Sequence, residues 1–117
     1  MGMEIFTAQI FTALADPTRR RIVELLSRGE CAAGEIVEAF DVSGPAISQH
    51  LKVLREAALV QARIEGQRRI YQLNPQGLSE MDAWLNDVRR FWAPRLDALE
   101  RELLKPERKP RAKGSRR

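Results

Sequence analysis

The 117-residue chain is poor in the residue types that carry most redox and metal chemistry. Cysteine and histidine occur once each, as Cys31 and His50, so no disulfide can form within the chain and soft metals lack ligands. Aromatic residues make up only 6%. The apolar runs are too short to span a membrane, and the N-terminus lacks the basic start of a secretory signal. These absences favour a single cytoplasmic domain without membrane contact.

Recognisable enzyme motifs are also missing. The sequence has no glycine-rich phosphate loop and no serine in the setting of a hydrolase nucleophile. Carboxylates such as Asp97 and Glu100 fit the solvated face of a long helix better than a catalytic pair. We therefore expect no enzymatic activity, no catalytic residues and no cofactor.

Positive charge is abundant but unevenly distributed. Residues 105–117 carry seven basic residues and one acidic residue, and residues 43–73 have a net charge of +3. The segments 1–42 and 74–104 are net acidic. Such local basic zones indicate an anionic partner. Residues 1–104 are expected to fold as one domain, followed by a disordered basic tail.

Apolar spacing of three and four residues predicts four helices in the first half of the chain. Asp16 and Ser43 can cap the second and fourth of them, and the prolines that follow both residues fit a first helical turn. Gly29 is expected to end the second helix. The predicted helices cover residues 5–14, 17–28, 33–40 and 44–58.

The period then changes to that of strands. Residues 59–64 and 68–73 are predicted as strands joined by a tight turn, in which Gly66 supplies a positive φ. A last helix begins at Pro75, and Pro94 should kink or split it. The short turn between the third and fourth helices and the hairpin after them predict a mainly α fold with a small β-hairpin wing, the winged helix-turn-helix.

The fourth predicted helix has a polar and basic outer face. On a helical wheel Gln49 lies opposite a buried stripe formed by Ile47, Leu51, Leu54 and Ala58. Glutamine can contact adenine through two hydrogen bonds, and serine can bond many base edges, whereas lysine and arginine reach phosphates. The candidate DNA contacts are Pro45, Ser48, Gln49, His50, Lys52 and Arg55. His50 lies at the shoulder of the stripe, which favours packing or a phosphate contact over base recognition.

The predicted hairpin adds a second basic element. Arg68 and Arg69 follow its turn, and Arg63 lies on the strand before it. Such a tip suits a phosphate backbone or a narrow minor groove. Although either basic surface could simply be solvated, their neighbourhood favours double-stranded DNA as the partner.

Four stretches resemble the ArsR/SmtB family of bacterial winged-helix repressors, and the similarity extends over about residues 5–104. They are Ala13–Ile22, Ser48–Ala57, Leu59–Val60 and Glu65–Tyr71. The resemblance implies a homodimer, paired through the first and last helices, that represses transcription from pseudo-palindromic operators. It implies operator contacts for Ser43, Ser48, Gln49, Lys52 and Arg68. Family members often have glutamine where this chain has Gly44, so the operator sequence cannot be transferred.

Metal sensing is a further property that the resemblance suggests, but this chain lacks the residues for it. One type of family site needs a Cys-Xaa-Cys cluster on the third helix, and the other needs histidine on the last helix. Neither pattern is present, so we expect no metal site. Cys31 is better explained as an inert small residue than as a redox switch.

The apolar stripe of the last helix is too long for a core of this size, and such a surface marks an interface. The expected dimer residues are Phe6, Ile10, Leu78, Met81, Leu85, Val88, Trp92, Leu96, Leu99 and Leu103. Three alternatives remain. Trp84, Phe91 and Trp92 could line a pocket for an organic effector, although the small-molecule effector is unknown. The chain could also be a non-specific architectural DNA-binding protein that relies on its tail, or a protein-interaction module.

Overall fold

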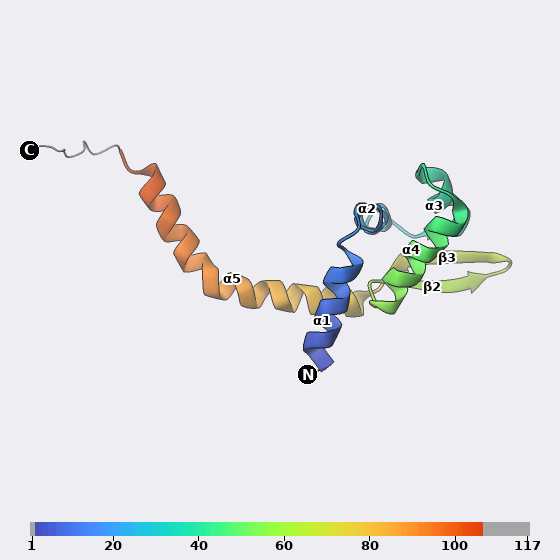
Figure 1. Ribbon diagram of the computed structural model, residues 1–117, viewed down its shortest axis with the longest axis horizontal. Helices are drawn as coiled ribbons and strands as arrows, with labels where there is room; N and C mark the ends of the chain where they lie inside the picture. Colours follow the sequence, from blue (N-terminus) through green and yellow to red (C-terminus); the bar gives the residue numbers. More distant parts are fainter. Residues whose placement is uncertain (1, 107–117) are drawn as a thin grey trace, which may run out of the picture. The chain divides into compact units, whose positions relative to one another are not determined.

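The computed structural model describes residues 2–106 (Figure 1). Residues up to Trp84 and residues from Leu85 onward form two compact units. Most of the predicted basic tail, residues 105–117, lies outside the described residues, so the tail and the division at residue 104 stay predictions. The elements are α1 (Gly2–Ala13), α2 (Pro17–Leu26), β1 (Cys31–Ala32), α3 (Ala33–Ala39), α4 (Gly44–Glu56), β2 (Val60–Glu65), β3 (Arg68–Leu73) and α5 (Pro75–Leu104).

Side-chain hydrogen bonds cap the starts of α2, α3 and α4. Asp16 accepts the backbone N–H of Arg19 at 3.1 Å, and the Ser43 hydroxyl accepts the N–H of Ala46 at 3.2 Å. These contacts confirm the two predicted caps, since each satisfies an N–H that has no partner inside its helix. At the start of α3 the N–H of Ala32 donates to the Glu35 carboxylate at 2.7 Å.

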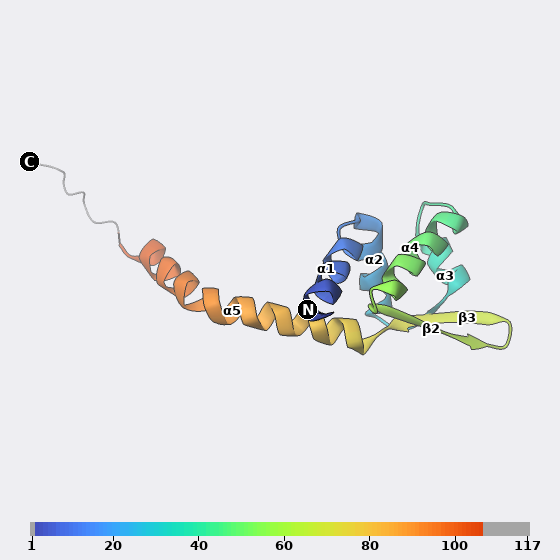
Figure 2. The same ribbon diagram turned by 60° about the horizontal axis from the view of Figure 1, so that its bottom comes forward.

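The wing is part of a three-stranded antiparallel sheet in the order β1-β3-β2. The predicted hairpin is confirmed, with Glu65 opposite Arg68 around Gly66, whose φ is 66°. Strand β1, which pairs only Cys31 and Ala32 with β3, is not among the predicted strands. Both views show β2 and β3 running beside α4, with their turn at the outer end (Figures 1 and 2). The central strand β3 is thus held from both sides.

The core of the first unit draws on all four N-terminal helices and the sheet. Ile47, Leu51 and Leu54 are buried, as the wheel of α4 predicts, but Ala57 rather than Ala58 completes the stripe. The reason is that α4 ends at Glu56 and Ala58 adopts a left-handed conformation with a φ of 59°. The fully buried large side chains are Ile10, Ile22, Ile36, Ile47, Leu51, Leu54, Leu59 and Val60.

A close backbone contact joins the start of α5 to the turn after α4. The N–H of Gly77 donates to the carbonyl of Ala58 at 2.9 Å, and the N–H of Asn74 donates to Leu59 at the same distance. A Cβ atom on Gly77 would lie 2.2 Å from the Ala58 oxygen. Only glycine therefore permits this approach.

Helix α5 runs without interruption from Pro75 to Leu104. Of the two predicted effects of Pro94, a split of the helix is therefore wrong. Near the start of α5, Leu78 and Met81 are partly buried against the core of the first unit. Further along, the stripe becomes exposed, and Leu103 retains 74% of its accessible surface. Within residues 2–106 no helix combines the length and apolar character needed to cross a membrane.

Candidate nucleic-acid interface

The outward face of α4 is polar and basic. Its buried side holds the core stripe, and its opposite side exposes Ser48, Gln49, Lys52 and Arg55. Pro45 is also exposed in the first turn. The structure therefore brings together on one surface the α4 residues that the helical wheel selects. Ser43 is exposed just before them, with its hydroxyl oxygen committed to the cap of the helix.

His50 is turned away from this surface toward the start of α2. Its Nδ1 lies 3.3 Å from a guanidinium nitrogen of Arg19 and 3.9 Å from the Asp16 carboxylate. Arg19 also donates through Nε to the carbonyl of Ala13 at 2.5 Å. The Arg19 N–H, together with the charges of His50 and Arg19, holds the pKa of Asp16 below its usual range. This arrangement favours the packing role of His50, because its ring joins α4 to the α1–α2 corner.

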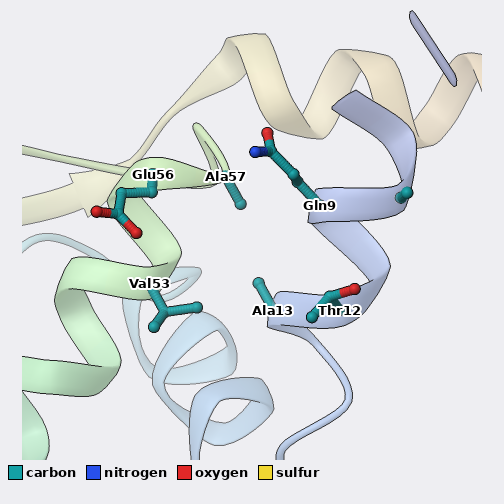
Figure 3. A pocket seen from close by; sticks show the side chains of 7 residues that line it. Gln9, Thr12, Ala13, Val53, Glu56 and Ala57 are labelled. Carbon is teal, nitrogen blue, oxygen red and sulfur yellow. The ribbon is translucent and has the colours of Figure 1, made fainter. Parts of the chain in front are cut away.

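A pocket of about 350 Å³ lies between α1 and α4. Figure 3 shows Gln9, Thr12 and Ala13 of α1 on one side of it, and Val53 and Glu56 of α4, with the following Ala57, on the other. No aromatic side chain lines this pocket. It is therefore not the effector pocket that Trp84, Phe91 and Trp92 could line, and that alternative stays a prediction.

The tip of the wing carries two exposed arginines. Arg68 and Arg69 are the first residues of β3, and both side chains are exposed. Residues directly opposite each other in an antiparallel pair share a face of the sheet. Arg68 therefore lies on the face of Glu65, and Arg69 lies on the opposite face, beside Ile64. The two arginines thus present positive charge on both faces of the tip.

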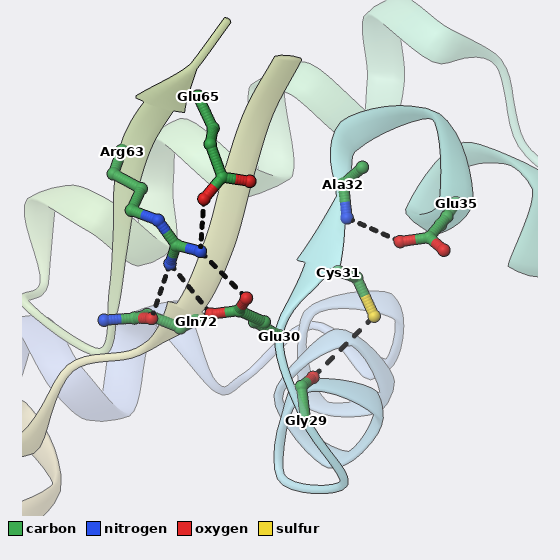
Figure 4. Close-up of polar contacts among 8 residues, drawn as sticks. All are labelled: Gly29, Glu30, Cys31, Ala32, Glu35, Arg63, Glu65 and Gln72. Atoms are coloured by element: carbon green, nitrogen blue, oxygen red, sulfur yellow. Dashed lines mark hydrogen bonds and ion pairs between the residues drawn. The ribbon is translucent and has the colours of Figure 1, made fainter.

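Arg63 differs from these arginines because its charge is already matched. Its guanidinium donates two hydrogen bonds of 2.8 Å to the carboxylate of Glu30, one of 3.1 Å to Gln72 and one of 3.3 Å to Glu65 (Figure 4). The bond from Arg63 holds the pKa of Glu30 below its usual range. Arg63 is therefore not one of the free basic residues of the wing, and no local sequence pattern indicates a partner 33 residues away.

Cys31 is half-buried in β1, opposite Tyr71. Its thiol faces the carbonyl of Gly29 at 3.8 Å, and burial together with the charge of Glu35 raises its pKa. A raised pKa reduces the thiolate fraction, which is the reactive form. Across residues 2–106 no three His, Cys, Asp or Glu side chains are grouped so that they could hold a metal ion.

The apolar residues expected at a dimer interface fall into different environments. Ile10 is fully buried in the protomer's own core, so we leave it out of the interface, whereas Phe6 is half-buried. Phe11, which is not among the predicted interface residues, has an exposed ring that packs edge-on against Trp84 of α5, with ring centroids 4.9 Å apart. Within the second unit Phe91 and Trp92 form another edge-to-face pair at 5.0 Å. The remaining interface candidates in this unit are exposed or half-buried: Leu85, Val88, Leu96, Leu99 and Leu103.

Known proteins resemble the chain in sequence and fold. The family model described as "Bacterial regulatory protein, arsR family" matches residues 16–62, from the cap of α2 into β2. The HTH-type transcriptional regulator Rv2034 of Mycobacterium tuberculosis is 55% identical over 80 residues, which are 68% of this chain and 72% of that protein. The transcriptional repressor SdpR of Bacillus subtilis is 41% identical over 76 residues, 65% of this chain and 84% of that protein.

A solved structure extends the likeness to the fold. The homodimeric winged helix-turn-helix DNA-binding domain of a possible ArsR-family regulator from Mycobacterium bovis superimposes with a TM-score of 0.64 at 28% identity. The match covers 79% of this chain and 87% of that domain. The shared arrangement of helices and wing, the matched family model and the relatives over most of their length confirm the predicted fold and the absence of an enzymatic role. The chain therefore belongs to the arsR family of bacterial regulatory proteins and is a winged helix-turn-helix transcriptional regulator that binds DNA.

Proposed function

We propose that the protein is a homodimeric repressor that binds a pseudo-palindromic operator, with α4 in the major groove and the wing on flanking DNA. The observation that carries this proposal is the exposed polar and basic face of α4, next to a wing tip with two exposed arginines. The groove admits a helix whose outer side chains are short, polar or basic. A two-fold dimer would set two such helices about 34 Å apart, one turn of DNA.

The exposed residues take different roles in this proposal. Ser48 and Gln49 contact base edges, because their groups can donate and accept hydrogen bonds there. Lys52 and Arg55 contact phosphates and fix the position of the helix. Arg68 and Arg69 contact the backbone or the minor groove from the wing. The other residues act indirectly: Ser43 caps the helix, Pro45 shapes its first turn and His50 holds it against α2.

Dimerisation is supported by the apolar side chains that the single chain leaves exposed. Phe91, Leu96, Leu99 and Leu103 each expose more than half of their surface. Burying such side chains is favourable by about 25 cal/mol per Å² of apolar surface. We assign to the interface the two aromatic residues Phe11 and Trp84 and all the candidates named from the sequence except Ile10.

Operator binding is proposed to be independent of metals and thiol oxidants. One thiol and one imidazole per chain are fewer than a site for a soft metal needs. The thiol is half-buried, its pKa is raised, and a reversible peroxide switch normally needs a second, resolving cysteine.

The experiment that tests the proposal selects an operator from a library of random duplexes and compares its affinity with that of a scrambled duplex at fixed salt. We expect a preference of 10³-fold or more, which is typical of specific regulators. We also expect a dimer by sedimentation at micromolar concentration. Equal affinity for both duplexes would mean a non-specific architectural protein, and no binding at low salt would mean a protein-interaction module.

An organic effector is a second candidate property, favoured by the pocket between α1 and α4 (Figure 3). Its lining is largely aliphatic, with Gln9, Thr12 and Glu56 as polar groups. A ligand there would contact both a proposed dimer helix and the DNA-binding helix. A screen for small molecules that release operator DNA, repeated on Thr12→Trp to fill the pocket from its exposed rim, would test it.

A further inference from the structure

The ion pair between Glu30 and Arg63 spans the whole width of the sheet. Glu30 lies directly before β1, at one edge, and Arg63 lies in β2, at the other edge. Gln72 on the central strand β3 accepts a hydrogen bond from the same guanidinium. The three side chains therefore connect all three strands by contacts that are separate from the backbone ladder (Figure 4).

The geometry of the pair is that of a specific contact. Two parallel N–H···O bonds of 2.8 Å join the guanidinium to both oxygens of Glu30, which is the bidentate form that orders an arginine best. Glu65 binds the same guanidinium from the tip side. Because the groups are partly exposed, the pair adds little to global stability. Its main effect is to select one arrangement of the side chains and of the strands that carry them.

The ion-paired group of Glu30, Arg63 and Gln72, called the strap below, lies over an apolar residue next to the wing tip. Arg63 is directly opposite Ile70 in the register, so both side chains lie on the same face of the sheet. Ile70 is only 4% exposed, although it is not part of the main core cluster. The aliphatic part of an arginine covers apolar surface well, and Arg63 is placed to do so here. Ile70 is two residues from Arg68, so the strap fixes the part of β3 that lies next to the proposed DNA contacts.

Backbone hydrogen bonds alone attach the wing only weakly to β1. Strand β1 contributes only two residue pairs to the sheet, whereas β2 and β3 share six. An isolated two-stranded hairpin is only marginally stable in water. Val60 and Tyr71 anchor the base of the hairpin in the core. Beyond them, the orientation of its exposed outer part depends on the short β1 ladder and on the contact of Glu30 with Arg63.

We propose that Glu30 is a positioning residue for DNA binding: through Arg63 it fixes the wing in the orientation from which Arg68 and Arg69 reach DNA. The proposal rests on the proposed DNA-binding role of the wing. It also means that Glu30 strengthens DNA binding, although its negative charge by itself would weaken it. A carboxylate near DNA weakens binding by repulsion, whereas this one makes the contacts of two nearby arginines effective.

A double-mutant cycle separates these two effects. The affinity for one duplex is measured for the wild type, Glu30→Ala, Arg68→Ala and the double variant. The loss of a negative charge multiplies the affinity by the same factor whether or not Arg68 is present. If Glu30 positions the wing, Arg68→Ala weakens binding at least threefold less in the Glu30→Ala background than in the wild type. An equal loss in both backgrounds would overturn the proposal.

Two controls complete the design. Glu24→Ala removes an exposed carboxylate of α2 with the same change in charge, and it should leave the cost of Arg68→Ala unchanged. In the exchange Glu30→Arg with Arg63→Glu, Arg68→Ala should again cause most of the loss of affinity that it causes in the wild type. Failure to restore any of this loss would count against the proposal. The cycle can be run on random duplex, because wing contacts to phosphates need no operator. If the protein shows no operator preference, the proposed repressor function is contradicted, while the cycle on random duplex still tests the role of Glu30.

Discussion

Replacing Gly77 with alanine should disrupt the contact between α5 and the turn after α4. The new Cβ would lie 2.2 Å from the Ala58 oxygen and 2.7 Å from its carbonyl carbon, whereas ordinary contact begins at 3.4 Å. Both atoms belong to the backbone, so no side chain can rotate away. The two segments must move apart by more than 1 Å.

The cost of this movement can be estimated from the contacts that it breaks. Separation weakens the 2.9 Å hydrogen bond from Gly77 to Ala58, worth about 1 kcal/mol. Overpacking of a well-fitted site costs about 1–3 kcal/mol more. The higher helix propensity of alanine returns about 1 kcal/mol. The expected loss of unfolding free energy is therefore about 2 kcal/mol, which lowers Tm by roughly 8 °C for a chain of this size.

Urea unfolding, followed by circular dichroism at a fixed protomer concentration, measures this loss. Gly34→Ala is the matched control, because Gly34 also lies in a helix but a Cβ atom there meets nothing within 4 Å. The control should be neutral or stabilised by up to about 1 kcal/mol. If both variants had the same stability, the proposed close contact at Gly77 would be refuted.

Four further predictions concern DNA binding and stability. Gln49→Ala should lose about 1–3 kcal/mol of operator discrimination per half-site and keep its affinity for random duplex. Arg68→Ala should instead weaken binding to operator and random duplex alike and flatten the salt dependence of the affinity. Equal losses of affinity for Gln49→Ala on the two duplexes would contradict base recognition. Asp16→Ala should cost about 1 kcal/mol at pH 7 as a lost cap. Because the folded-state pKa of Asp16 is lowered, its contribution is complete above the unfolded pKa near 4 and fades as the pH falls through the folded value. The difference in stability between wild type and variant in urea melts should therefore shrink as the pH falls below about 4. Zinc, arsenite and mild peroxide should leave operator anisotropy titrations unchanged, and a tenfold loss that is absent in Cys31→Ser would show a thiol sensor. Deleting residues 105–117 should reduce the salt dependence and leave the ratio of operator to random binding unchanged, and an unaltered salt slope would mean that the tail makes no contact with DNA.

Local signals explain why so much of the first unit could be predicted from the sequence. The caps at Asp16 and Ser43 act on N–H groups three residues away. The burial of Ile47, Leu51 and Leu54 in α4 follows from helical periodicity. The hairpin turn needs a positive φ that Gly66 supplies. These features depend on neighbours in the chain, which a sequence displays directly.

Several of the missed features depend on contacts between distant segments. Strand β1 is only two residues long and exists because β3 lies beside it. Ile10 and Phe11 are adjacent apolar residues, and only the packed structure decides that the first is buried and the second exposed. Arg63 belongs to a basic segment by sequence, but a carboxylate 33 residues earlier neutralises it. Tertiary partners, rather than composition, decide which positive charges remain available to DNA.

The placement of the tryptophans makes the protein its own optical probe. The chain has two, Trp84 and Trp92, and both lie half exposed on α5, with none on α4 or the wing. Indole emission shifts to shorter wavelength when water is removed from the ring. Intrinsic fluorescence should therefore report the covering of α5 by a second subunit, while a labelled duplex reports occupancy of α4. Subunit association and DNA binding can thus be followed in one cuvette at separate wavelengths.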